Sequence, residues 1–290
     1  MPHRSPVDVR SLAALGFEWL LILAALLTAL RVSTWGGAWW VTCCAYVAAF
    51  VVIATRQHAL LMLFHDAVHG SLARNRSAND GLINALIGVP ALLPVELYRP
   101  LHLKHHHALG TSADPERELL YAGQLWNYRP LETWPLVLQL IGDLLVVNGA
   151  RTMAAWRQAG GSLRMRPTTL GIATLWLVGI AALAWQSPQA AATALLLWFA
   201  PLLTLTQLLQ KLRSFAEHSG GPGVTADWDD WTYTWRIGPA GRLTIWPYNI
   251  NLHLEHHANP AVPWHELPAL AKATPRFRAS NTLWELLHRR

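Results

Sequence analysis

Histidine recurs at short, repeated spacings in three separate parts of this chain. Residues 101–107 read LHLKHHH, residues 65–70 read HDAVHG, and residues 253–257 read HLEHH. Within each stretch the histidines lie three or four positions apart, so in a helix they would share one face. One further histidine, His218, follows an apolar run that ends near residue 209. The nine histidines of interest are His65, His69, His102, His105, His106, His218, His253, His256 and His257.

Metal binding is the chemistry that this pattern favours. Neutral imidazole is the commonest metal ligand in proteins and suits iron, zinc and copper. A single i, i+4 pair of histidines is more often structural, but three clustered sets point to a metal. Because one zinc ion takes about four donors, nine histidines fit two metal ions better than one. The spacing alone leaves the identity of the metal open.

Two other kinds of metal site fit the sequence poorly. The HExxH motif of zinc metalloproteases begins at His265 and Glu266, but its last position is Ala269. A membrane cytochrome would carry its haem-ligating histidines inside the apolar runs, and the nine histidines lie outside them.

Long apolar runs predict the elements that must position these histidines. The chain is 52% hydrophobic and only 14% charged, far below the roughly 25% charged residues of a soluble domain. Two weaker runs, 81–97 and 134–147, carry basic residues on both flanks, so we interpret them as interfacial or re-entrant. Glu18, in the first long run, is expected to face the helix bundle. The four runs that predict membrane-spanning helices are about 12–30, 38–55, 168–185 and 190–209.

The second spanning helix is expected to continue beyond the membrane through ATRQHALLMLFHDAVHG. At 1.5 Å per residue, His65 would lie roughly 15 Å beyond Thr55, and Gly70 suits the end of the helix. The sequence thus predicts an all-α integral membrane protein in which four transmembrane helices support a helical cap that carries the histidines.

The basic residues predict which side of the membrane holds the cap. Four crossings place residues 1–11, 56–167 and 210–290 on one side, and of the 23 Lys and Arg residues only Arg31 lies elsewhere. By the positive-inside rule that side is cytoplasmic, so both termini and the histidines are expected there. The net charge of +6 suits contact with anionic membrane lipids and gives no reason to expect a nucleic acid partner.

The three histidine stretches also carry a family resemblance. HDAVHG, HLKHH and HLEHH, in this order around four spanning helices, resemble the three histidine boxes of the integral-membrane fatty acid desaturase and hydroxylase family. The similarity runs from about residue 58 to 270 and includes LGTSADPE after the second box and HLEHHANPAVPWHELPAL around the third. Ala258 and Asn259 depart from the apolar or aromatic residues usual there. The resemblance implies one desaturase-like domain over residues 1–290, with catalytic segments 56–167 and 210–290.

The resemblance implies that the nine histidines ligate two non-haem irons, with O₂ as co-substrate. Asn249 lies four residues before His253, a spacing at which an asparagine of related acyl-CoA desaturases holds an iron through water; an ordinary helix-end asparagine is the alternative. Asp66, Glu217 and Glu255 lie next to ligand positions and are candidates to orient imidazole N–H groups.

Desaturation of a lipid or fatty acyl chain is the leading functional hypothesis from this resemblance. Hydroxylation, carotenoid ketolation and decarboxylation of a fatty acid to a terminal alkene use the same boxes. Electrons are expected from an external donor such as ferredoxin and its reductase, and the small size suits a bacterial inner-membrane enzyme. A histidine-rich membrane metal transporter is the alternative of another class, although within the spanning runs only Glu18 offers a charged group for an ion path.

Overall fold

Helices make up nearly all the regular structure of the chain in this computed structural model, which describes residues 6–116, 133–159, 164–218, 231–273 and 277–279. Two short strands, β1 and β2, pair in parallel. The α-helices are α1 (Val9–Ser33), α2 (Trp39–Ala67), α3 (Arg76–Ile83), α4 (Val95–Ala108), α6 (Thr133–Asp143), α7 (Val146–Ala159), α8 (Pro167–Gln186), α9 (Pro188–Leu203), α10 (Leu205–His218), α11 (Pro239–Leu243), α12 (His253–Ala258) and α13 (Leu267–Ala273). The other elements are a π-helix η1 (Asn84–Gly88), a 3₁₀-helix η3 (Pro247–Asn249), β1 (Thr234–Arg236) and β2 (Phe277–Ala279).

Four helical stretches in the described part of the chain are long and apolar enough to cross a membrane, which confirms the four predicted spans. They are α1, α2, α8 and the combined stretch Pro188–His218. As predicted, α2 continues well past residue 55 and ends at Ala67. The fourth stretch differs from expectation because a break at Thr204 (φ −129°, ψ −95°) divides it into α9 and α10. Pro201, which lacks a backbone N–H, lies three residues before this break.

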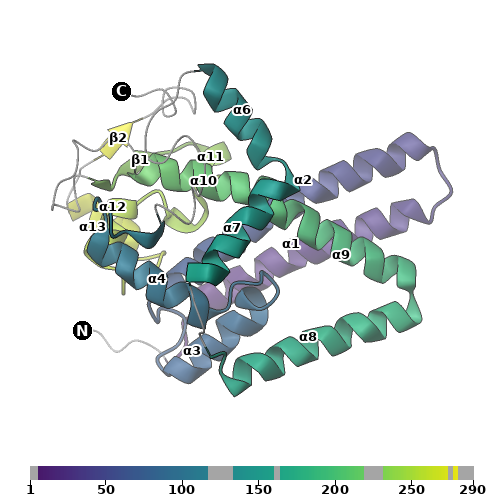
Figure 1. Ribbon diagram of the computed structural model, residues 1–290, viewed down its shortest axis with the longest axis horizontal. Helices are drawn as coiled ribbons and strands as arrows, with labels where there is room; N and C mark the ends of the chain where they lie inside the picture. The colour runs from purple at the N-terminus through teal and green to yellow at the C-terminus, as the bar shows by residue number, and fades with distance from the viewer. Residues whose placement is uncertain (1–5, 117–132, 160–163, 219–230, 274–276, 280–290) are drawn as a thin grey trace.

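The two helical hairpins, α1–α2 and α8–α9, extend away from the rest of the molecule (Figure 1). Their outward faces are apolar: Leu20 and Leu175 expose 66% and 72% of their surface. Lipid is the solvent in which such faces are stable. Trp39 and Trp185, exposed at helix ends, suit the membrane interface. The opposite end gathers α4, α10, α12 and α13, the cap in which the histidines lie (Figure 1).

The two weaker apolar runs do not form spanning helices. Run 81–97 is divided among the end of α3, the π-helix η1, a turn in which Leu92 has φ +58°, and the start of α4. Run 134–147 is shared by α6 and the start of α7. The two ends of the chain, residues 1–5 and 280–290, lie outside the described residues, so their predicted side of the membrane stays a prediction.

Glu18 faces the interior of the bundle, as its sequence context predicted. It is 2% exposed and pairs with Arg56 of α2, whose Nη1 lies 3.2 Å from the carboxylate. Tyr248 donates its hydroxyl to the same carboxylate, and Arg56 also donates to the carbonyl of Leu243. The pair therefore joins the first two spanning helices to the segment that precedes the third histidine box.

Arg56→Met is expected to destabilise the protein by about 3–5 kcal/mol, because it leaves the Glu18 carboxylate buried without its partner cation. Arg31→Met, at an exposed position near the end of α1, is the matched control and should change stability by less than about 0.5 kcal/mol. Denaturant unfolding of the detergent-solubilised variants measures both. Equal stability of the two variants would show that the buried pair contributes nothing.

Candidate metal centre

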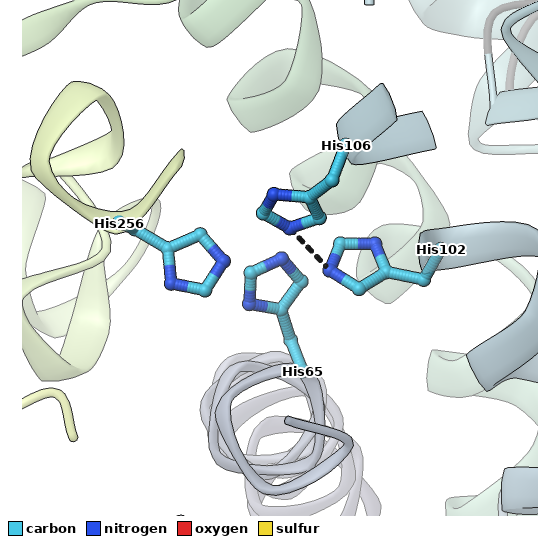
Figure 2. Close-up of side chains that lie close together, drawn as sticks. All are labelled: His65, His102, His106 and His256. Atoms are coloured by element: carbon cyan, nitrogen blue, oxygen red, sulfur yellow. Dashed lines mark hydrogen bonds between the residues drawn. The ribbon is translucent and has the colours of Figure 1, made fainter. Parts of the chain in front are cut away.

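Eight of the nine predicted histidines form two compact clusters. In each cluster the four potential ligand nitrogens lie within 4.8 Å of one another. Site A consists of His65, His102, His106 and His256, whose rings converge from α2, α4 and α12 in Figure 2. Site B consists of His105, His218, His253 and His257.

Two short helices each supply both sites. In α4, His102 and His106 belong to site A while His105 belongs to site B. In α12, His253 and His257 belong to site B while His256 belongs to site A. A helix turns about 100° per residue, so an i, i+4 pair projects to nearly the same side and the third histidine projects to another. Each HxxHH stretch thereby bridges two centres.

The ninth histidine, His69, lies beside site A as a fifth imidazole. Its Nε2 is 3.1 Å from Nε2 of His102. Its ring centroid is 4.8 Å from that of His106 and 5.0 Å from that of His256. The positive φ of Gly70, +87°, follows directly and turns the chain after α2, a conformation that glycine adopts without strain. The described structure therefore brings all nine predicted histidines together, five at site A and four at site B.

Several ring nitrogens are spaced as ligands of a shared ion would be. Two nitrogens that bind one metal at about 2.1 Å and at a right angle lie about 3.0 Å apart. The Nε2–Nε2 distance is 3.1 Å for the pairs His69–His102, His102–His106, His218–His253 and His253–His257. Each of His102 and His253 thus has two close Nε2 neighbours around a common centre.

Hydrogen bonds at the opposite ring nitrogens orient the lone pairs inward. His218 donates from Nδ1 to the Trp231 carbonyl at 3.0 Å. His105 Nδ1 donates to both carboxylate oxygens of Asp114 at 2.9 Å, and His102 Nδ1 to Glu116 at 2.7 Å. A neutral imidazole carries only one N–H, so Nε2 of His102 and of His218, whose pKa values are lowered by burial, presents a lone pair to its cluster. Lone pairs this close repel one another unless a cation lies between them, so the donor set fits bound metal.

One buried nitrogen at site A supports the same conclusion. Nε2 of His256 is buried and has no hydrogen-bond partner in the part of the chain that the structure describes. Buried polar atoms are nearly always satisfied in native proteins. A metal ion would satisfy this one.

Burial keeps most of these imidazoles in the form that binds metal. Burial and the neighbouring His69 lower the pKa of His106 to about 2. Burial, with nearby arginines, lowers the pKa of His69 to about 3. Both rings are therefore neutral at physiological pH, as ligation requires. At His105 burial acts in the same direction, but the carboxylates of Glu116 and Asp114 outweigh it and raise the pKa to about 9.

Asp114 and Glu116 are candidate site residues that the histidine spacing did not reveal. They are 1% and 5% exposed and contact one ligand of each site, His105 and His102 respectively. Tyr98 adds a hydroxyl 3.2 Å from His102 Nδ1. A signal was present, because both acids belong to the LGTSADPE stretch that carries part of the family resemblance.

The three acidic residues that the sequence suggested, Asp66, Glu217 and Glu255, each have different hydrogen-bond and ion-pair partners. Glu217 lies 3.4 Å from Nε2 of His253 and pairs with Arg213. Asp66 accepts from Ser71 and from the Trp264 backbone, and Glu255 accepts from Thr234. The amide of Asn249 donates to the Trp264 carbonyl at 3.1 Å. The roles of these four residues at the metals stay predictions.

Curated relatives of this chain are named as carotenoid ketolases and as a desaturase. Beta-carotene 4-ketolase 3 of Haematococcus lacustris is 24% identical over 79% of this chain and 63% of its own length. Zeaxanthin 4-ketolase of Chlamydomonas reinhardtii is 27% identical over 90% of this chain and 51% of its own length. Dihydrorhizobitoxine desaturase of Bradyrhizobium elkanii is 25% identical over 96% of this chain and 80% of its own length. The chain thus spans less than two thirds of either ketolase.

The family profile described as Fatty acid desaturase matches residues 38–285. This match includes all nine histidines, both sites and three of the four spanning stretches. With four candidate spans it makes the chain an integral membrane protein. The chain belongs to the fatty acid desaturase family.

Proposed function

We propose that this chain is a membrane-bound, O₂-dependent oxidoreductase that holds two non-haem irons and desaturates a lipid acyl chain. The observation that carries the proposal is the pair of histidine clusters, built from the three boxes and His218. Membership of the family implies non-haem iron oxidation chemistry, and two clusters support two ions rather than one. Site A with His69 would hold one iron and site B the other.

The bound irons would supply activation of O₂ for attack on an unactivated C–H bond. The protein's own residues hold the ligands in place and exclude water. Asp114 and Glu116 fix the ring orientations of His105 and His102, and such partners also strengthen imidazole as a ligand. Site B is fully buried, and at site A only His106 and the neighbouring His69 are partly exposed. A dry site protects a strong oxidant from side reactions with solvent.

A small, largely apolar cavity lies next to site A and suits a substrate that approaches from the membrane. It has a volume of about 50 Å³. Its lining includes Leu61 and Tyr98, each four residues before a site A ligand, His65 and His102. Four residues are about one helical turn, so the cavity lies one turn from the histidines on both α2 and α4. In α2 that turn is the one nearer the membrane.

Desaturation is the leading reaction because the Bradyrhizobium elkanii desaturase aligns with 96% of this chain and 80% of its own length. Ketolation of a carotenoid ring is the second candidate, since other relatives are named as carotenoid ketolases. Desaturation takes two electrons from the substrate, whereas reduction of O₂ to water takes four. The other two must come from a donor, and we propose an external one such as ferredoxin with its reductase.

The topology of the proposed enzyme follows the positive-inside rule. Residues 1–290 would form one domain whose catalytic segments, 56–167 and 210–290, lie on the cytoplasmic side of a bacterial inner membrane. The distribution of Lys and Arg supports this orientation.

Mass spectrometry of lipids, volatile hydrocarbons and pigments tests the reaction. Cells that express the wild type with a ferredoxin system should accumulate a product two hydrogens lighter than its precursor, and cells with His105→Ala should not. A product that gains oxygen on a carotenoid ring would favour the second candidate. Identical profiles for wild type and His105→Ala, with both chains present in the membrane, would contradict the proposed function.

A further inference from the structure

The cavity beside the metal sites is lined by both apolar and polar side chains, which we term its apolar wall and its polar wall. Leu61, Phe64, Ala91, Leu202 and Trp156 contribute to the apolar wall, and Tyr98, Glu116, Gln207, Gln210 and Arg213 to the polar one. A cavity meant only for a hydrocarbon chain would need no such polar side. The contacts of the polar residues show which of them are available to a ligand.

Most of the polar wall is already engaged. Tyr98 and Glu116 both contact Nδ1 of His102. Gln207 donates its amide to the Leu202 carbonyl at 3.1 Å. These groups hold the metal ligands and the helix break after Pro201, so they are poor candidates for recognition.

Two atoms of the polar wall have no hydrogen-bond partner among the described residues: Nε of Arg213 and Oε1 of Gln210. Arg213 is only 6% exposed, and its Nη1 is bonded to Glu217, which fixes the guanidinium. The two residues are three positions apart on α10, so they lie on the same helix face. Leaving a buried donor and a buried acceptor unsatisfied is costly, so we expect a group that both donates and accepts, either water or part of a ligand, to satisfy them.

We propose that this cavity binds a hydroxyl group carried by an otherwise apolar molecule. The hydroxyl oxygen accepts from Arg213 Nε–H, and the hydroxyl hydrogen is donated to Gln210 Oε1. A hydroxyl both donates and accepts, whereas an ether or a ketone only accepts. A carboxylate fits poorly because Glu217 already balances the charge of Arg213 and Glu116 lies on the same wall.

The position of this subsite gives it a role in the proposed reaction. Arg213 lies five residues before His218 on α10, as Tyr98 lies four before His102 on α4. A hydroxyl held there anchors one end of the molecule about one helical turn from the metal ligands. The inference rests on the proposed function, because the bound molecule is taken to be its substrate: a lipid-like compound with a hydroxylated end.

Photolabelling with three matched probes tests the subsite without requiring turnover. The probes are a diazirine-bearing octanol, its methyl ether and the corresponding alkane, applied to the purified protein in lipid nanodiscs. Peptide mass spectrometry should find cavity residues such as Leu61 and Trp156 labelled at least about threefold more by the alcohol than by the other two, the preference expected of one net hydrogen bond.

Gln210→Leu should reduce labelling by the alcohol to the level of the ether. Gln189→Leu is the matched control, because Gln189 lies in the first turn of α9, at the end of that helix away from α10. It should leave labelling by the alcohol unchanged. Metal content measured on the same samples shows whether each variant is folded. If Gln210→Leu loses its metal, the three-probe comparison on the wild type decides alone.

Equal labelling of the cavity by the three probes would overturn the inference, and so would no labelling of a chain that holds its metals. These outcomes are separate from failure of the proposed function. A chain that discriminates between the probes but never oxidises a lipid would contradict the function, whereas an active chain without discrimination would contradict only the hydroxyl subsite.

Discussion

Replacing His106 by alanine is expected to abolish product formation, whereas replacing its neighbour His107 should leave the rate within about twofold of the wild type. His106 belongs to site A, with Nε2 3.1 Å from that of His102. His107 is exposed on the same helix. The two substitutions remove the same side chain at adjacent positions, so they differ only in what that side chain contacts. Product formation and bound iron are measured on the same purified samples.

The pair of variants separates metal ligation from general damage to α4. A fall in both variants would indicate that the helix tolerates no change. Full activity of His106→Ala would contradict the assignment of His106 to the metal centre. We predict that His106→Ala loses iron from site A and keeps the fold.

Asp114→Ala and Glu116→Ala are each expected to weaken metal binding about 10- to 100-fold, the usual cost of removing a partner that orients a ligating histidine. The first change acts on site B through His105, and the second on site A through His102. Each also leaves a buried imidazole N–H without its acceptor. Chelator titration of the purified variants measures the change as a lower concentration for half-removal of metal.

Glu266→Ala is the control for these two variants, because Glu266 is an exposed carboxylate in the same C-terminal region as the third box. It should hold metal as tightly as the wild type does. Unchanged chelator resistance in Asp114→Ala would mean that this hydrogen bond contributes nothing to metal affinity.

The histidine spacing singled out the nine histidines that lie together in the structure, but not how they divide between the two clusters. The spacing of His102, His105 and His106 places them on one broad face of a helix. Because a helix turns about 100° per residue, His105 projects in a different direction from the other two and belongs to the other site. Which histidines from distant segments meet is decided by the packing of α2, α4, α10 and α12, and residue spacing along the chain does not reveal that packing.

Local backbone features were harder still to predict. Tyr248 and Asn249 have positive φ values of +54° and +56°, an unfavourable conformation for residues other than glycine. The contacts that hold them come from afar: Glu18 binds the Tyr248 hydroxyl, and the Trp264 carbonyl binds the Asn249 amide. Propensity cannot anticipate strain that tertiary contacts offset. Likewise, residue spacing did not show that the loop after α4 folds back on that helix so that Asp114 contacts His105.

Metal analysis of the purified wild-type chain, combined with its absorption spectrum, tests the two-iron centre most directly. We predict about two tightly held irons per chain and no haem band, because five histidines converge at site A and four at site B. Exchangeable zinc, as a metal transporter would carry, or a single iron per chain would contradict it.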